Sequence, residues 1–164
     1  MLFGGIDPGE MAGASIWDED ELLWFTQGEM EFVLRETIRY ARALEQPHIV
    51  WGIEAPFVGK GPHASLEDAM KAGEARGWLR CAGLASNPWM AKPSSWRKYF
   101  GMNKKVVGDD GKKRNPNRKE LKERAIVQAS KLSGKILRNS QEHVAEAICI
   151  GRARCLRWRE QTGS

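Results

Sequence analysis

Two short apolar segments of the chain each end in a carboxylate. Residues 2–6, LFGGI, lead into Asp7, and residues 48–54, HIVWGIE, end in Glu54. Asp-Pro-Gly after the first segment is a turn signal, and the second segment is rich in β-branched and aromatic residues, as expected of a strand buried on both faces. A carboxylate at the end of a buried strand costs desolvation unless something compensates its charge. The sequence therefore predicts two strand ends that share a stabilising partner.

The segments between and after these strands predict a mixed α/β fold. ASIW and ELLWFT, separated by a polar turn, indicate that the first three strands form an antiparallel meander. Apolar residues at helical spacing predict an amphipathic helix over 29–45, which Pro47 ends. Ser65, with Asp68 in the capping-box position, opens a second helix that reaches about residue 85.

The C-terminal half adds one strand and three helices. The expected elements are a strand in NPWMAK, a brief helix in SSWRKYF, and helices over 118–131 and 140–159. The order β-β-β-α-β-α-β-α-α describes a mixed five-stranded sheet with helices on both faces. The connection from Trp24 to Trp51 should be a right-handed crossover between parallel strands. Residues 101–117 lack apolar periodicity and predict an exposed flexible loop.

Size and composition favour one intracellular domain over residues 1–164. The hydrophobic share of 41% is typical of a globular protein, and no apolar run approaches the roughly 20 residues of a membrane span. The first residues lack the features of a signal peptide. Cys81, Cys149 and Cys155 form no CxxC pair, so we expect small buried thiols and neither a disulfide nor a zinc site.

Basic residues are concentrated in two zones. The net charge is only +5, but nine Lys and Arg side chains lie between Lys104 and Arg124, and four arginines lie between Arg152 and Arg159. Such clusters suit a polyanion better than a diffuse solubilising surface does. Together with the carboxylates, this pattern points to a metal-dependent nuclease.

The last predicted helix supplies further metal-capable side chains. In SQEHVAEAICIG, His143 and Glu146 are three residues apart and share a helix face, so both can point at one ion. Asn139 and Glu142 match a capping box, which indicates a structural role for Glu142. Hard oxygen ligands favour Mg²⁺ or Mn²⁺, and an imidazole favours Mn²⁺ somewhat.

Five segments in order resemble RuvC-type Holliday junction resolvases, which belong to the ribonuclease-H-like superfamily. These segments are GGIDPG with the nearby Gly13, IEAPF, AMKAGEARGWL, KPSSWRKYFG and EHVAEAICIG. The resemblance covers nearly the whole chain, and the short length looks like a compact phage version of the family. It implies an α/β, ribonuclease-H-like fold, a homodimer with two-fold symmetry, and DNA recombination or repair on branched DNA.

The resemblance also implies roles for single residues in two-metal phosphodiester hydrolysis. Asp7 would bridge two Mg²⁺ or Mn²⁺ ions, His143 and Glu146 would complete the ion next to the attacking water, and Glu54 would help hold the ion at the leaving 3′-oxygen. Lys122 approximates a family lysine near the phosphate, although Lys119 matches almost equally well.

The family pattern further implies a DNA-contacting set. Phe57 corresponds to an aromatic residue that stacks on a base near the cut. Arg76 could contact DNA or a partner protein, or it could pair with Glu74 or Glu54. The helix with Gly73, Gly77, Trp78 and Leu79 resembles the family's dimerisation helix. The remaining predicted DNA contacts are Lys60, Lys92, Arg97, Lys98, Lys104, Lys105, Lys112, Lys113, Arg114, Arg118 and Lys119.

Three alternatives stay open from the sequence. The chain could cut RNA–DNA hybrids or flaps, it could bind junctions without cutting them, or it could serve RNA processing as a ribonuclease-H-like protein. A resolvase would act in the cytoplasm, in the host's cytoplasm if the protein is viral, and would need no membrane.

Overall fold

The computed structural model describes residues 1–44, 48–56, 62–85, 87–109 and 111–163. A five-stranded sheet runs through its centre in the order β3-β2-β1-β4-β5. The strands are β1 Leu2–Asp7, β2 Met11–Asp18, β3 Glu21–Glu29, β4 Ile49–Glu54 and β5 Trp89–Ala91. The first three form the predicted antiparallel meander, and β1, β4 and β5 run parallel to one another. The prediction of a mixed five-stranded sheet is confirmed.

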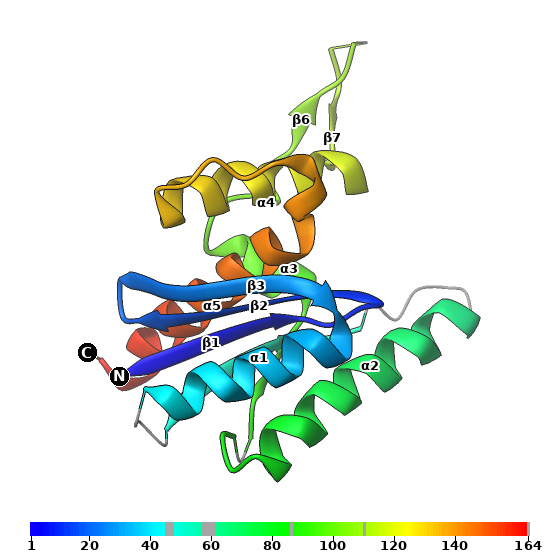
Figure 1. Cartoon of the computed structure of the whole chain (residues 1–164). Coiled ribbons are helices and arrows are strands. Elements are labelled where there is room, and N and C mark those ends of the chain that lie inside the picture. The colour runs from blue at the N-terminus through cyan, green and yellow to red at the C-terminus, as the bar shows by residue number, and fades with distance from the viewer. Residues whose placement is uncertain (45–47, 57–61, 86, 110, 164) are drawn as a thin grey trace.

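Helices cover both faces of this sheet (Figure 1). One face carries α1 Met30–Ala43 and α2 Pro62–Cys81, which share a core with β1, β2 and β4. The other face carries α5 Glu142–Thr162, against which α3 Pro93–Lys98 and α4 Arg118–Ser133 pack. The connection from β3 through α1 joins parallel strands as predicted, but β4 pairs with β1 rather than with β3.

Helix α5 lies unusually close to the sheet because two strand positions carry no side chain. A Cβ atom at Gly13 would lie 2.2 Å from the carbonyl oxygen of His143, and one at Gly5 would lie 2.2 Å from that of Ala147. The Ser15 hydroxyl donates to the Ala147 carbonyl oxygen at 2.8 Å. The first turns of α5 are therefore held directly against β1 and β2.

Residues 101–117 differ from the predicted loop. Here β6 Val106–Val107 and β7 Lys113–Arg114 pair as a short antiparallel ribbon, which projects from the body beyond α4 (Figure 1). Gly111 has φ +72°, and its amide donates to the Gly108 carbonyl oxygen at 2.9 Å, so the turn needs glycine's left-handed conformation. The glycines therefore close a hairpin.

Two arginines attach the ribbon to α4. Arg114 donates two hydrogen bonds of 2.8 Å to the Glu120 carboxylate, and Arg124 donates to the carbonyl oxygens of Met102 and Lys104. Asn117 and Glu120 form a capping box at the start of α4. Both ends of the ribbon are thus fastened to one helix.

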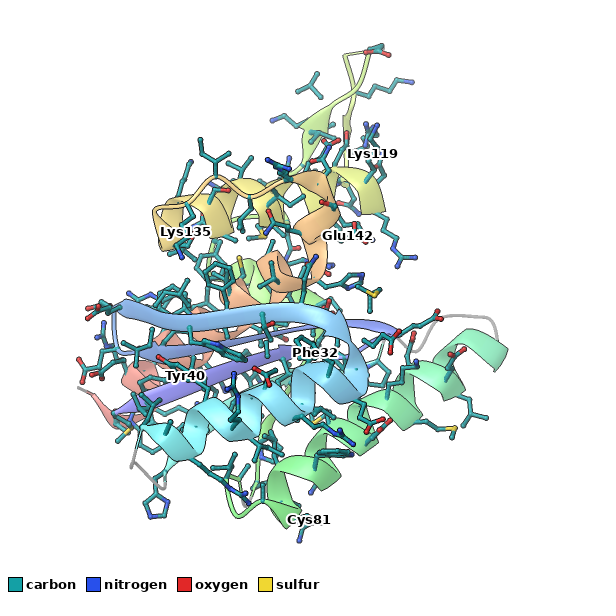
Figure 2. The ribbon with its side chains drawn as sticks, viewed as in Figure 1. Phe32, Tyr40, Cys81, Lys119, Lys135 and Glu142 are labelled. Carbon is teal, nitrogen blue, oxygen red and sulfur yellow. The ribbon has the colours of Figure 1, made fainter. Side chains whose placement is uncertain are left out.

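Several local predictions need correction. Helix α2 begins at Pro62, so Ser65 lies inside it rather than at its start. The predicted capping box of Asn139 and Glu142 does not form, because Asn139–Gln141 is a 3₁₀ turn and Gln141 precedes α5. Cys149 and Cys155 are buried as predicted, but Cys81 is exposed at the end of α2 (Figure 2). Pro47 lies outside the described residues.

None of the helices within the described ranges is both long and apolar enough to cross a membrane.

Candidate metal and nucleic-acid site

The carboxylates of Asp7 and Glu54 end two neighbouring parallel strands. Ile6 pairs with Ile53 in the β1–β4 register, so Asp7 and Glu54 are the next residues on each strand. Asp7 is 5% exposed, and Glu54 is partly buried. Parallel pairing explains why the two side chains emerge at the same edge of the sheet, as the sequence predicted.

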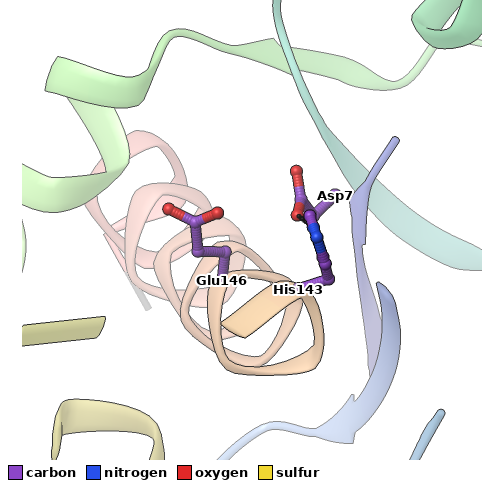
Figure 3. A group of neighbouring side chains, drawn as sticks. All are labelled: Asp7, His143 and Glu146. Carbon is purple, nitrogen blue, oxygen red and sulfur yellow. Dashed lines mark hydrogen bonds and ion pairs between the residues drawn. The ribbon is translucent and has the colours of Figure 1, made fainter. Parts of the chain in front are cut away.

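The first turns of α5 bring His143 and Glu146 to the same edge. His143 Nδ1 lies 2.8 Å from Asp7 Oδ2, and Glu146 is 6% exposed. The candidate ligand atoms of Asp7, His143 and Glu146 all lie within 4.8 Å of one another (Figure 3). Residues about 140 positions apart in the chain thus form one cluster.

A glutamine on β3 fixes the start of α5. The Gln27 side-chain amide nitrogen donates to the Ser140 carbonyl oxygen at 2.9 Å, and its oxygen accepts from the Val144 amide at 3.4 Å. This pair of bonds satisfies backbone groups that the helix itself leaves unpaired. Gln27 and Gly13 therefore place His143 from two sides.

Helix α3 supplies two donors to the carboxylates. The Trp96 indole nitrogen donates to Glu54 Oε1 at 3.0 Å, and Arg97 Nη2 donates to Glu146 Oε1 at 2.9 Å. The Arg97 side chain is only 16% exposed, and its Nε is buried without a partner among the described residues. Arg97, which was predicted to face the DNA backbone, instead points into the acidic cluster.

Burial and mutual repulsion raise the pKa values of all three carboxyl groups. Desolvation is the main cause in each case; it raises the pKa of Glu54 to about 8 and the pKa of Asp7 well above its usual value. The pKa of Glu146 is also raised, first by burial and then by the charge of Glu54, while Arg97 and Lys122 lower it. The side-chain interaction between Asp7 and Glu54 raises the pKa of Glu54 and lowers that of Asp7.

This electrostatic pattern fits a divalent cation. Asp7 and Glu146 are buried and Glu54 is partly buried, so their carboxylates repel one another when all are ionised, and a cation would relieve that repulsion. Carboxylate oxygens with one imidazole are a suitable donor set for Mg²⁺ or Mn²⁺. Asp7, His143 and Glu146 could share one ion, and Glu54 ends the strand next to Asp7.

The sequence has no counterpart among protein-family models or curated proteins, but its three-dimensional structure does have counterparts. RuvC from T. thermophilus, in complex with a Holliday junction substrate, superposes with a TM-score of 0.68 at 15% identity, covering 99% of this chain and 97% of that one. A second structure of Thermus thermophilus RuvC has a TM-score of 0.57 at 13% identity over the same shares. The chain has a RuvC-type fold. The expected ribonuclease-H-like architecture is thereby confirmed.

Within this RuvC-type fold, Lys122 is nearer the acidic cluster than Lys119. Lys122 contacts Glu142, and its charge lowers the pKa values of Asp7 and Glu146. Glu142 Oε1 also lies 3.5 Å from His143 Nε2. Lys119 is exposed on the first turn of α4 (Figure 2). Glu142, expected to cap the helix, instead links Lys122 to His143.

The other predicted DNA contacts lie in several parts of the structure. Lys104, Lys105, Lys112, Lys113 and Arg118 are exposed on the ribbon and the start of α4, and Lys92 and Lys98 are exposed at the two ends of α3. Arg114 belongs to the ribbon too, but its guanidinium is bonded to Glu120. Arg76 is exposed on α2, across the sheet from the ribbon (Figure 1). Phe57 and Lys60 lie outside the described residues.

Some functional neighbours carried no recognisable sequence signal. Trp96 and Arg97 read as a core residue and a basic surface residue, and only the placement of α3 beside β4 brings them to the carboxylates. Gln27 is an ordinary polar residue on a strand. Gly13 was noted as part of a motif, and its close contact with α5 gives that motif a physical reason.

Proposed function

We propose that the protein is a structure-selective, metal-dependent endodeoxyribonuclease that resolves four-way junctions and other branched DNA by paired symmetric nicks. The cluster of Asp7, His143 and Glu146, with Glu54 at the end of the strand next to Asp7, carries the proposal. The RuvC-type fold supports it, since the superposed T. thermophilus protein is bound to a Holliday junction substrate. In this proposal the protein cuts DNA strands in the cytoplasm.

The chain's own residues would divide the work. Asp7 would be shared between two ions, His143 and Glu146 would complete one, and Glu54 would help hold the other. Bound Mg²⁺ or Mn²⁺ would supply Lewis-acid stabilisation of the phosphate's charge and lower the pKa of the attacking water. Lys122 and Arg97 would offset the negative charge that DNA adds to the cluster, and Trp96 excludes water from one side because it is fully buried.

The exposed lysines would bind the phosphate backbone. The ribbon and α3 lie on the same side of the sheet as α4 and α5, and the first turns of α5 carry His143 and Glu146 (Figure 1). Backbone neutralisation of this kind reads shape rather than base sequence. A branched substrate could therefore contact the ribbon and the site together.

One experiment separates this function from its rivals. The protein is incubated with four-way junction, flap, linear duplex and RNA–DNA hybrid in Mg²⁺, Mn²⁺ or chelator. Paired nicks on the junction that require metal support the proposal. Preferential loss of the hybrid's RNA strand would identify a ribonuclease-H-like activity, and tight junction binding without product would identify a binding protein.

Asp7→Asn tests the site itself. This variant should lose cleavage by at least about a hundredfold and keep junction affinity, because the amide cannot bridge cations. Glu31→Gln, which removes one exposed carboxylate on α1, is the matched control and should cut normally. Cleavage by Asp7→Asn at the wild-type rate would refute the assignment.

We also propose that the protein forms a homodimer through α2. Leu66 and Met70 are 64% and 67% exposed, and Cβ atoms at Gly73 and Gly77 would meet nothing within 4 Å. These positions recur at helical spacing and form one open face. Leu79 of the same helix is fully buried in the core and does not belong to this face. Met70→Glu should convert a dimer to a monomer in light scattering and abolish paired nicking while leaving the fold intact.

A further inference from the structure

Two adjacent residues of the short helix α3 reach two different carboxylates of the acidic cluster. The chain passes from β5 directly into α3, and Ala91 on β5 pairs with Glu54 on β4. The Ala55 amide also donates to the Ala91 carbonyl oxygen at 2.9 Å. This connection places the start of α3 beside the end of β4, so Trp96 meets Glu54 and Arg97 meets Glu146.

We propose that Trp96 is a positioning residue whose indole N–H holds the Glu54 carboxylate in the orientation that receives a divalent cation. The inference rests on the proposed function and extends it to a residue that touches neither metal nor DNA. An indole nitrogen can only donate, so it cannot coordinate a cation or transfer a proton at neutral pH. Its bond occupies Oε1 of Glu54 and leaves the other carboxylate oxygen for a cation.

Rotamer restriction is the physical reason for such a role. A glutamate side chain has three rotatable bonds, and fixing them costs conformational entropy. Trp96 is 0% exposed and sits in the core between the sheet, α3 and α5, so its indole cannot move with the carboxylate. A rigid donor therefore removes that entropy before the cation arrives. Hydrogen-bond partners of metal ligands act in this way, and their loss typically lowers metal affinity about 10–100-fold.

Two other buried tryptophans show that packing alone does not explain this bond. Trp17 is 1% exposed in the same core cluster, and its indole nitrogen has no hydrogen-bond partner among the described residues. Trp51, also 1% exposed, lies in the core on the other face of the sheet and donates to the Leu84 carbonyl oxygen at 3.1 Å rather than to a carboxylate. Among the described residues, the indole N–H of Trp17 thus has no hydrogen-bond partner, and that of Trp51 bonds to the backbone; only the bond of Trp96 reaches a carboxylate of the cluster.

These residues provide matched controls. Trp96→Phe, Trp17→Phe and Trp51→Phe each remove a similar volume from a buried position, but only the first removes a donor from a carboxylate of the cluster. Mn²⁺ binding is measured from the electron paramagnetic resonance signal of the free ion, and folding from thermal unfolding in chelator. Junction cleavage is measured in parallel as a function of Mn²⁺ concentration.

The expected result is a loss of Mn²⁺ affinity of about tenfold or more at one site in Trp96→Phe. Its cleavage should need correspondingly more Mn²⁺ and recover toward the wild-type rate at saturation. Trp17→Phe and Trp51→Phe should bind Mn²⁺ like the wild type even where their melting temperatures fall. Mn²⁺ affinity in Trp96→Phe within about twofold of that in Trp17→Phe would overturn the inference.

A second replacement covers the case in which Trp96→Phe does not fold. Benzothienylalanine at position 96 has nearly the shape of tryptophan, with sulfur in place of the N–H, so it should show the same loss of affinity with little loss of stability. Unchanged Mn²⁺ affinity in that protein would also refute the role of Trp96. Failure of the wild type itself to bind Mn²⁺ or to cut junctions would refute the proposed function, a distinct outcome.

Discussion

Replacing Glu54 with glutamine should stabilise the metal-free protein, and the gain should grow with pH. The amide oxygen of the introduced glutamine can still accept the Trp96 hydrogen bond of 3.0 Å, but it carries no charge into the buried cluster. In the wild type, burial and the neighbouring Asp7 charge raise the pKa of Glu54 from 4.5 to about 8. Neutralising this position removes an electrostatic cost that only a bound cation would otherwise relieve.

The sign follows from the raised pKa. A carboxyl group that binds its proton more tightly in the folded state stabilises the protein below its unfolded pKa, and this stability is lost as pH rises through the folded pKa. Between the unfolded and the folded pKa, each pH unit lowers the free energy of unfolding by about 1.4 kcal/mol. With a pKa of about 8 in the folded protein, the advantage of Glu54→Gln should grow by about 4 kcal/mol between about pH 5 and about pH 8.5.

The assay is urea unfolding in chelator at both pH values, with Glu31→Gln as the control. Glu31 is exposed on α1 and pairs with Arg35 at the surface, so its neutralisation should change stability by less than about 0.5 kcal/mol at either pH. Mn²⁺ should narrow the difference between the wild type and Glu54→Gln, because only the wild-type carboxylate gains from the cation. If Glu54→Gln differed from the wild type by the same free energy of unfolding at both pH values, the raised pKa of Glu54 would be refuted.

Three further predictions concern the elements that hold and extend the site. Gly13→Ala should lower stability in thermal unfolding by about 1–3 kcal/mol and weaken cleavage, because its methyl group meets the His143 carbonyl oxygen at 2.2 Å; an unchanged melting temperature would contradict this close packing. Lys104→Gln with Lys105→Gln should weaken junction binding and reduce the salt slope by up to about 0.9 per lost contact in binding titrations; an unchanged slope would exclude these lysines from the backbone contacts. Arg114→Ala and Glu120→Ala should each weaken junction binding to a similar degree, and the double variant no further, because the two side chains act as one pair; additive losses would contradict that pairing.

The sequence predicted those parts of the site that follow from strand endings and helix spacing. Asp7 and Glu54 end apolar runs, and His143 and Glu146 lie three apart, so their convergence needed only parallel pairing of β1 with β4 and α5 placed on the sheet. Arg97 could not be placed in this way. Its position beside Glu146 depends on how α3 follows β5, which is a tertiary result that no local pattern encodes.

The other differences come from competing local signals. Asn139 and Glu142 have capping-box spacing, but a 3₁₀ turn takes up residues 139–141 and leaves Glu142 to bond with Lys122. The ribbon was missed because its polar and basic composition is typical of a loop. The Asp-Gly step at 110–111 near two valines, a known hairpin signal, would have predicted it.

Helix α4 links the ribbon to the site through three of its neighbouring side chains. Glu120 and Arg124 fasten the two ends of the ribbon, and between them Lys122 contacts Glu142, whose carboxylate lies 3.5 Å from the His143 ring. Because both ends of the ribbon are bonded to α4, the orientation of the ribbon depends on the position of this helix. The ribbon and the His143 ring therefore depend on one supporting helix, and a shift of α4 relative to α5 would disturb both.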